Sequence, residues 1–384
     1  MKERVNSMSN ITRNNGFLCI SFNQEETKNA KDIFLKSYTI NEAIPIELLK
    51  KDPPAKLVTN TDTNSSTPIE VEDIHQYPYN ACGQITGKIG TATYIGSASV
   101  FKRPDIILTA AHCVYNAGQK CFISSPTFYW KRKENIASAI VPITHIFIPE
   151  EFEKNDDLQY DYAICVLERF IGDRRNTLQY NPECSKDSAF MIGYPGAEPY
   201  DGTKMYYIED SVDVKEIDKK NFWHVTNGLA YGGASGGPWV VNDTVFGVTS
   251  FGYEGVKEVF SPILDQKLPS LYEEAVKVAP LNSISAFHLE NDWGWFVNEI
   301  HTQYEGQTYE DDNNILINSS GTSSLKDHIP DYAVINIKVY VMAGEDNYGS
   351  EKFIFDPNSN VRACYKISGT TFDNELTFEG LETY

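Results

Sequence analysis

The chain has 384 residues, of which 41% are apolar and 22% charged, a composition that fits a soluble protein of two or three globular domains. Its 53 acidic and 33 basic residues give a formal charge of −20. Such a surface repels phosphate backbones, which argues against a nucleic-acid partner, although the acidity could reflect solubility alone.

Residues 1–75 are mostly polar and are predicted to form an N-terminal extension or propeptide with a linker. A candidate amphipathic helix covers residues 26–37, and residues 51–68 are rich in Pro, Thr, Asn and Ser, as linkers are. The apolar run at 16–22 is too short and too interrupted for a signal-peptide core. No stretch approaches the roughly 18 apolar residues of a membrane span. We therefore expect a cytoplasmic protein without a membrane partner, and secretion without a conventional signal stays open.

Residues 76–280 consist of short apolar runs separated by Gly, Asn, Asp and Pro. Many of these runs have strand length and are β-branched or aromatic, which favours a sandwich or barrel over a parallel α/β sheet. Near the end of this region, Ser261 could cap a helix that starts at Pro262. Because Pro269 would break it, we expect a short turn and then a helix over residues 270–278.

Residues 285–384 are predicted to form a separate β-rich domain. Ile335, Ile337, Val339 and Val341 alternate with other residues, as in a strand. The aromatic cluster at 293–297 is interpreted as core between domains rather than as a ligand surface. The acidic run at 310–314 lacks the spaced ligands of a calcium loop and is interpreted as a solvated turn.

The seven cysteines are scattered and show no CxxC pair, so no zinc site is predicted. An odd number cannot all pair within one chain. Cys113 and Cys121 could bridge a short loop, but the spacing alone leaves this open.

The segment GGASGGPW at residues 232–239 is the most informative motif. A serine between glycines suits a nucleophile, because the backbone must turn tightly and lie close to a substrate carbonyl. The N–H groups of Gly233 and Ser235 could form an oxyanion hole. A tight glycine turn between strands is the structural alternative.

Two further segments supply candidate partners for Ser235. His112 ends the run DIILTAAHC, where small residues could hold a general base rigidly. Asp161 begins the run DYAICVL, where a buried carboxylate could orient that imidazole. Asp156 and Asp157 are competitors, but neither leads directly into the apolar run. Since all three motifs lie in the strand-rich region in the order His, Asp, Ser, coincidence is improbable.

LTAAHC, DYAICVL and GGASGGP resemble the catalytic signatures of chymotrypsin/trypsin-like serine peptidases, and YPYNACGQI and FMIGYP resemble the bacterial branch of glutamyl endopeptidases and V8-type proteases. The resemblance covers residues 77–279. It implies a mainly β fold with two packed six-stranded barrels and a triad in the cleft between them. The predicted C-terminal β-rich domain is additional to these barrels. His112 and Asp161 would come from the first barrel and Ser235 from the second.

The sequence departs from this family at three positions. Ala234 precedes the nucleophile where digestive members carry the aspartate of the zymogen switch. Ser97 and Ser99, rather than a cysteine, lie on the strand where the usual partner of Cys113 would be, so Cys113 is free or bonded elsewhere. Thr249 stands where the glutamyl-specific branch has a histidine, which argues against glutamate specificity.

The same resemblance assigns the residues that bind substrate. Ser250, Phe251 and Gly252 would pair with the substrate backbone as an added strand. Leu229 and Ala230 would form the floor of the S1 pocket, and their neutral character favours apolar or small uncharged residues at the cleaved position.

These observations predict a serine endopeptidase that uses an acyl-enzyme, needs no metal or organic cofactor and acts on a restricted set of protein substrates. A regulatory partner could bind the N- or C-terminal region. Two alternatives stay open: a catalytically silent fold kept as a protein-binding module, and a chain whose flanking domains do the main work.

Overall fold

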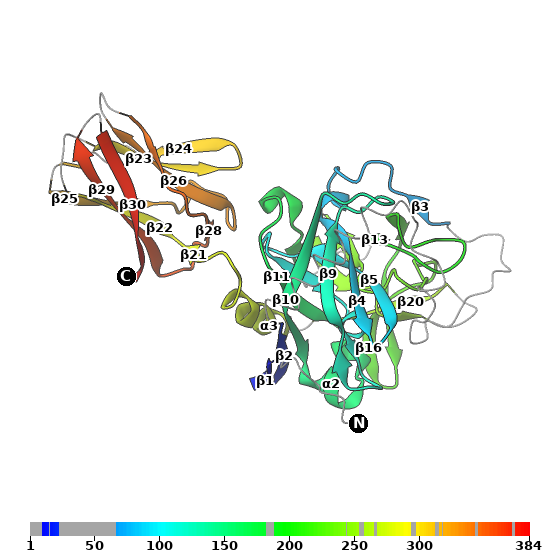
Figure 1. Ribbon diagram of the computed structural model, residues 1–384. Helices are drawn as coiled ribbons and strands as arrows, with labels where there is room; N and C mark the ends of the chain where they lie inside the picture. The colour runs from blue at the N-terminus through cyan, green and yellow to red at the C-terminus, as the bar shows by residue number, and fades with distance from the viewer. Residues whose placement is uncertain are drawn as a thin grey trace. The chain divides into compact units, whose positions relative to one another are not determined.

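The computed structural model describes residues 10–14, 16–22, 67–181, 188–242, 244–252, 257–264, 267–292, 297–311, 315–316, 318–341, 345–370 and 373–384. The chain divides into two compact units, Met1–Pro280 and Leu281–Tyr384, and both are built mainly of β-strands (Figure 1). The candidate helix at 26–37 and most of the predicted linker lie outside the described residues.

A closed six-stranded barrel forms the first half of the larger unit. Its strands pair in the order β10-β11-β6-β5-β4-β9, and β9 pairs back with β10 to close the ring. They are β4 (Cys82–Ile89), β5 (Ala92–Val100), β6 (Ile106–Thr109), β9 (Ser124–Trp130), β10 (Ala139–Pro149) and β11 (Ala163–Leu167). Every residue of β6 and β11 is buried, which explains why these two strands are continuous apolar runs.

The N-terminal segments belong partly to this unit. The hairpin of β1 (Asn10–Asn14) and β2 (Phe17–Ser21) extends the barrel sheet, because β2 pairs with β10 from His145 to Pro149. Phe17, Leu18 and Ile20 are buried in the same core. The short strand β3 (Ile69–Glu70) pairs with a strand of the second half. Apolar side chains and strand pairing thus join both segments of the predicted extension to the larger unit, and whether the extension is a removable propeptide stays a prediction.

The second half of this unit consists of two sheets around one core. Six strands pair in the order β12-β18-β17-β13-β14-β3 and four in the order β15-β16-β20-β19. They are β12 (Gln179–Tyr180), β13 (Ala189–Gly193), β14 (Tyr206–Asp210), β17 (Pro238–Val241), β18 (Thr244–Val248), β15 (Asp213–Ile217), β16 (Lys220–Val225), β19 (Phe251–Gly252) and β20 (Val259–Pro262). Met191, Trp239 and Phe246 from the first sheet share a core with Trp223 and Val259 from the second.

Two short α-helices accompany the strands within the described ranges. Helix α2 (Glu150–Asn155) follows β10, and helix α3 (Lys267–Val276) packs against β10 and β11. The predicted start at Ser261 and Pro262 is wrong, because both residues end strand β20. Pro269 does not break α3 because it lies in the first turn, where a backbone N–H would have no helical partner.

The second unit is a β-sandwich. One sheet pairs in the order β21-β28-β26-β23-β24, with β27 also on β26, and the other pairs in the order β25-β22-β29-β30. Their bounds are β21 (Ser283–Ile284), β22 (Ala286–Asn291), β23 (Val297–Tyr304), β24 (Gln307–Asp311), β25 (Ser319–Ser324), β26 (Val334–Val341), β27 (Asn347–Tyr348), β28 (Phe353–Phe355), β29 (Val361–Thr370) and β30 (Asp373–Thr383). Both sheets contribute to one apolar core. The alternation of β26 is confirmed, since Ile335, Ile337, Val339 and Val341 are all buried.

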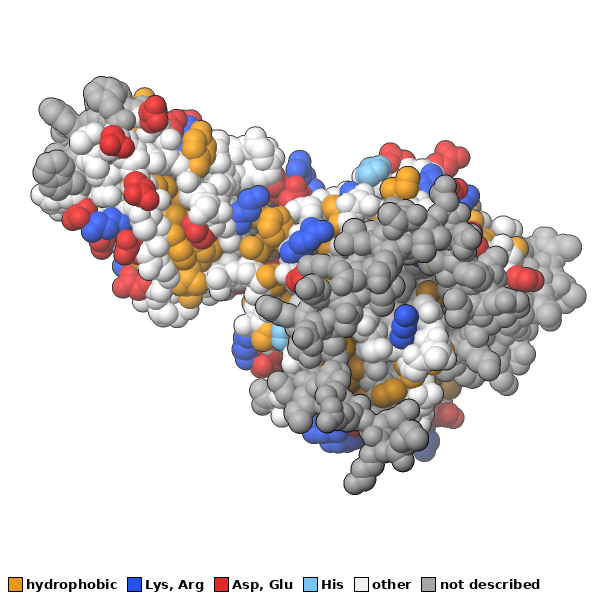
Figure 2. Space-filling view, in the orientation of Figure 1, with side chains coloured by type: hydrophobic (Ala, Val, Ile, Leu, Met, Phe, Trp, Pro, Cys, Tyr) orange, Lys and Arg blue, Asp and Glu red, His pale blue; other side chains and the backbone are white. Residues whose placement is uncertain are grey.

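The prediction of a mainly β fold with a closed six-stranded barrel and a further C-terminal β region is therefore confirmed. The aromatic residues 293–296 and residues 312–314 of the acidic run lie outside the described residues. Among described helices, none is long and apolar enough to cross a membrane. Where side chains are described on the face in Figure 2, acidic and basic groups are interspersed.

Candidate active site

His112 and Asp161 lie at the same end of two paired strands. Strands β6 and β11 pair with Thr109 opposite Ala163, so the residues just after β6 and just before β11 meet. His112 lies on the 3₁₀ turn Ala111–Cys113, and Asp161 follows the 3₁₀ turn Leu158–Tyr160. The imidazole Nδ1 is 2.7 Å from Asp161 Oδ2, and the backbone N–H of His112 donates to Asp161 Oδ1 at 2.9 Å.

The two groups polarise each other electrostatically. Asp161 is fully buried, whereas the side chain of His112 keeps 30% of its surface exposed. Burial is the largest single influence and disfavours protonation of His112, but the Asp161 carboxylate, followed by Cys113, outweighs it and raises the pKa of His112 well above its ordinary value. Burial also acts against the charge of Asp161, but His112 and the hydrogen bonds to the carboxylate lower the pKa of Asp161. This pair is suited to hold a general base in one tautomer and one orientation.

Ser250 makes a third contact to Asp161. Its hydroxyl donates a hydrogen bond to Asp161 Oδ2, the same oxygen that faces His112 Nδ1, and the side chain is buried. Ser250 was predicted from the sequence only to pair with the substrate backbone, and its side-chain contact with Asp161 was missed. No local pattern indicates it, because the two residues lie 89 positions apart.

The competing carboxylates have other roles. Asp157 forms an ion pair with Lys220, with 2.7 Å between Oδ2 and Nζ, and accepts a hydrogen bond from the N–H of Gln159. Asp156 ends helix α2 in the left-handed conformation. Its pKa is raised by burial and by the charge of Asp161. The structure thus brings Asp161, rather than either competitor, against the imidazole.

Ser235 lies in a tight turn that glycines make possible. Gly233 and Gly236 adopt positive φ angles of 89° and 79°, which residues with a Cβ rarely adopt. The Ser97 hydroxyl donates to the carbonyl of Gly233 at 2.7 Å, and the Ser97 N–H donates to the carbonyl of Ser235 at the same distance. The turn is therefore held to strand β5 on both sides of the serine, whose side chain is partly exposed.

This turn packs against the segment that carries His112. A Cβ at Gly236 would lie 2.1 Å from Thr109 Oγ1 and 2.9 Å from the nitrogen of Ala110. A Cβ at Gly96 would lie 2.8 Å from Cys113 Sγ and 3.4 Å from the carbonyl oxygen of Ser235. Both close approaches locate Ser235 beside the turn that bears His112.

The peptide between Gly232 and Gly233 directs its carbonyl toward Gly196. The carbonyl of Gly232 accepts a hydrogen bond from the N–H of Gly196 at 2.6 Å. In a trans peptide the N–H points opposite to the carbonyl, so the Gly233 N–H points away from Gly196. Within the described part of the chain, the N–H groups of Gly233 and Ser235 donate to no other group. Both N–H groups are therefore available to donate hydrogen bonds to a developing negative charge.

Cys113 has no disulfide partner among the described cysteines, and Cys121 is also free. The possible bridge between these two residues is therefore absent from the structure. The residue that faces Cys113 is Gly96 rather than Ser97 or Ser99. The side chain of Ser97 instead forms hydrogen bonds with the backbone of Gly233 and Tyr194. Cys113 Sγ lies 3.8 Å from His112 Nε2.

The predicted substrate-binding residues divide into two groups. Phe251 and Gly252 form β19, the edge strand of its sheet, so one side of the strand can pair with an added strand. Ala230 is partly buried, and its Cβ would lie 3.8 Å from a Cβ at Gly252. Leu229 has no exposed surface and belongs to the core of the second half, so Ala230 is better placed to face a substrate.

Thr249 is directed into the protein. Its hydroxyl accepts a hydrogen bond from the indole N–H of Trp239 at 3.0 Å, and both side chains are buried. The position at which the glutamyl-specific branch carries a histidine therefore contributes to the core here.

A family comparison agrees with this arrangement. The model of the family "Trypsin" matches residues 69–267, just over half of the chain. The chain therefore belongs to the trypsin family of serine peptidases. A search of the curated proteins found no match.

Solved structures with a similar backbone include several proteases. The protease Anisep from Arthrobacter nicotinovorans is 20% identical, with a TM-score of 0.45, and the match covers 55% of this chain and 97% of that one. A Glu endopeptidase is 19% identical, with a TM-score of 0.47, and the match covers 55% of this chain and 97% of that one. The thermostable serine protease AL20 from an extremophilic microorganism is 17% identical, with a TM-score of 0.46 and coverage of 52% and 98%.

Proposed function

We propose that this member of the trypsin family is an active serine endopeptidase in which Ser235, His112 and Asp161 form the catalytic triad. The observation that carries the proposal is the fully buried Asp161 carboxylate bonded to His112 beside the glycine-rich turn of Ser235. A buried carboxylate is costly unless it is paired and hydrogen-bonded, and here its partner is an imidazole beside a serine, an arrangement that is common at catalytic sites.

The reaction proceeds by acyl transfer. His112 Nε2 takes the proton of the Ser235 hydroxyl as Oγ attacks the substrate carbonyl carbon, and the carbonyl oxygen becomes an oxyanion. The N–H groups of Gly233 and Ser235 stabilise that charge. His112 then gives its proton to the departing amine, and the C–N bond breaks. A water molecule hydrolyses the acyl-enzyme by the same steps, with His112 again as the base.

The substrate is a protein or peptide that adds a strand to the free edge of β19. Residues Phe251 and Gly252 bind its backbone, and Ala230 borders the pocket for the residue at the cleaved position. The side chain of Thr249 is hydrogen-bonded to Trp239 and so is not available to bind an acidic substrate side chain. We therefore propose apolar or small uncharged residues at the cleaved position of the substrate. We further propose a restricted set of protein substrates, because a second β-rich unit follows the one that carries the site.

Digestion of a peptide library by the full chain tests this proposal. Cleavage by the wild type after apolar or small residues, reduced by about 10⁴–10⁶-fold in the Ser235→Ala variant, is the expected result. Cleavage mainly after Arg, Lys or Glu would overturn the specificity. Equal cleavage by both proteins would overturn the triad, and a folded chain with no cleavage at all would favour the binding-module alternative.

A further inference from the structure

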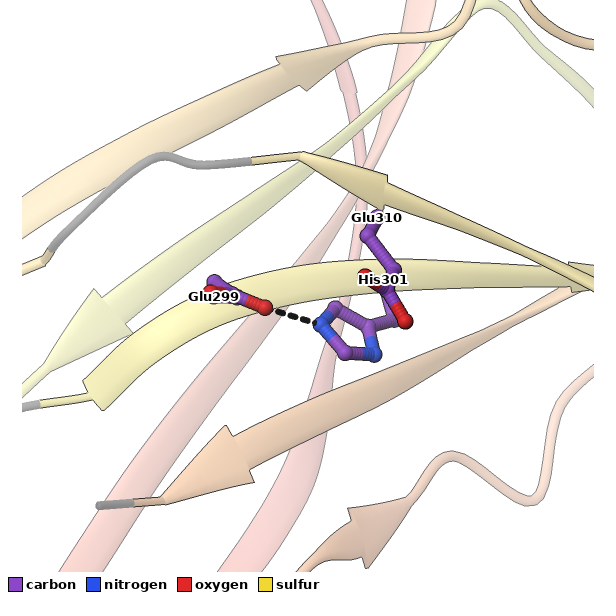
Figure 3. A group of neighbouring side chains, drawn as sticks. All are labelled: Glu299, His301 and Glu310. Carbon is purple, nitrogen blue, oxygen red and sulfur yellow. Dashed lines mark hydrogen bonds and ion pairs between the residues drawn. The ribbon is translucent and has the colours of Figure 1, made fainter.

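Three potential metal ligands meet on one face of the C-terminal unit. Glu299, His301 and Glu310 each place one ligand atom so that all three atoms lie within 4.8 Å of one another (Figure 3). None of these residues takes part in the peptidase site, which belongs to the other unit.

Strand pairing explains why these side chains converge. Glu299 and His301 are two residues apart on β23 and therefore lie on the same face. Glu310 on β24 is the direct antiparallel partner of His301, so its side chain shares that face. Ile300 and Thr302 alternate with them and are buried on the opposite face.

The imidazole of His301 is buried although its side chain is on the outer face. It is only 6% exposed, and its ring lies parallel to that of Tyr340 at a centroid distance of 6.1 Å. Nε2 is 2.5 Å from Glu299 Oε2, whereas Nδ1 is buried and has no hydrogen-bond partner. In Figure 3 the ring lies between the two carboxylates. Of the two ring nitrogens, Nε2 therefore faces Glu299 and is the one that could share an ion with it.

We propose that Glu299, His301 and Glu310 bind one Zn²⁺ ion. One imidazole nitrogen and two carboxylate oxygens are a ligand set that Zn²⁺ accepts, with a water molecule in the fourth position. Ligand atoms around a tetrahedral zinc ion lie about 3.3 Å apart, a separation that follows from bonds of about 2.0–2.1 Å. The present spread brackets this value, since the Glu299–His301 contact is shorter and the whole set extends to 4.8 Å. Glu310 is exposed, so its side chain is free of core packing that would prevent it from turning toward the other two ligands.

The neighbouring charges leave the site negative. Lys338 on β26 lies opposite His301 in the sheet, but its ammonium group is 2.8 Å from Asp346 Oδ2. Tyr340 lies opposite Glu299 and covers the ring of His301. The two carboxylates of Glu299 and Glu310 therefore keep the negative charge that attracts a divalent cation. A bound ion would tie β24 to β23 and stabilise this hairpin by linkage.

No zinc site was predicted from the sequence, because its scattered cysteines show no CxxC pair. Here the ligands come from two strands and include a single histidine, so only the register of the hairpin reveals them.

Calorimetric titration of the full chain with ZnCl₂ tests the proposal. Glu310→Gln and His301→Gln each remove one ligand, and Asp311→Asn is the matched control because it removes the same charge from the neighbouring position of β24. The control and the wild type should bind one more equivalent of Zn²⁺ than the two ligand variants. Loss of a group that only supports a ligand costs about 10–100-fold in metal affinity, so loss of a ligand should weaken binding at least as much.

The same stoichiometry and affinity in all four proteins would overturn the proposal, as would a wild type that binds no Zn²⁺ at 0.1 mM, roughly the weakest affinity of use to a structural site. Either result would mean that His301 is only hydrogen-bonded to Glu299 and binds no ion. If His301→Gln does not fold, Glu310→Gln decides the question, since Glu310 is exposed and contributes little to the core.

Discussion

Ser250 and His112 contact the same oxygen of Asp161. The hydroxyl of Ser250 and the Nδ1 atom of His112 both bond to Oδ2, while Oδ1 accepts the backbone N–H of His112. A buried carboxylate is thus satisfied by three donors, each of which favours its charged form. The residue before β19 is thereby connected to His112 through the side chain of Asp161.

Replacement of Ser250 by Ala should weaken this arrangement without removing it. A hydrogen bond to a charged group contributes about 1.5–3 kcal/mol, so we expect kcat/KM to fall by roughly 10–100-fold. The kcat/KM value measured across pH provides the check, because a purely structural effect would leave the pH profile unchanged. Ser211→Ala is the control, since this exposed serine also bonds to a carboxylate, that of Asp210. An equal loss of activity in both variants would contradict the assigned role.

The raised pKa of His112 predicts an acid limb in the activity profile. Only the neutral imidazole can accept the proton of Ser235, so kcat/KM should rise with pH and reach half of its maximum above pH 6.5, the ordinary pKa of histidine. Asp161→Asn should move this midpoint down and reduce kcat by about 10⁴-fold. A midpoint below 6.5 in the wild type would show that Asp161 does not stabilise the protonated ring.

The same shifts determine how the ion pair contributes to stability. The pKa of Asp161 is lowered in the fold, so its contribution is present above pH 3.8 and is lost as the pH falls through its folded value. The pKa of His112 is raised, so its contribution is present below pH 6.5 and is lost as the pH rises through its folded value.

Gly96 and Cys113 offer a site for an engineered disulfide. A Cβ at position 96 would lie 2.8 Å from Cys113 Sγ and 3.0 Å from Cys113 Cβ, so Gly96→Cys should form a bridge after a small backbone shift. We expect a gain of about 2 kcal/mol in the free energy of unfolding, the lower end of the usual range. Thiol titration and denaturant unfolding measure the two effects. Ser97→Cys is the control and should stay reduced, because its side chain faces Gly233; a bridge in this variant instead would contradict the geometry.

Gly236→Ala should be far more harmful than the same change at another glycine with positive φ. At Gly236 the new Cβ would meet Thr109 Oγ1 at 2.1 Å and the carbonyl oxygen of Ser97 at 2.3 Å, so the Ser235 turn must move. At Gly90, with a φ of 60°, no atom lies within 4 Å, and only the backbone strain of about 1–2 kcal/mol remains. Thermal unfolding and activity should separate the variants. Similar values for both would contradict the tight packing of this turn.

Much of the peptidase fold could be predicted because its strands carry local signals. The continuous apolar runs of β6 and β11 predicted buried strands, and the alternation in β26 predicted a strand with one buried face. The hairpin at residues 10–21 was missed because its partner, β10, lies more than 100 positions away, and pairing at that distance leaves no local pattern. The error at Pro269 arose because a proline in the first helical turn looks the same in sequence as one that ends a helix.

The residues of the candidate site also differ in whether a local sequence pattern indicates them. His112, Asp161 and Ser235 each lie in a recognisable local motif, so the sequence could indicate them. The hydroxyl of Ser250, the position that faces Cys113 and the burial of Leu229 depend on how distant segments pack. They became visible only in the structure.

The proposed function requires that Ser235 is an activated nucleophile. The most direct test is incubation of the purified chain with a fluorophosphonate probe, followed by intact-mass measurement of the wild type and of Ser235→Ala, His112→Ala and Ser211→Ala. We predict one covalent adduct on the wild type and on Ser211→Ala, and none on the other two variants. Labelling of Ser235→Ala, or a folded wild type without any adduct, would show that Ser235 is not the activated nucleophile.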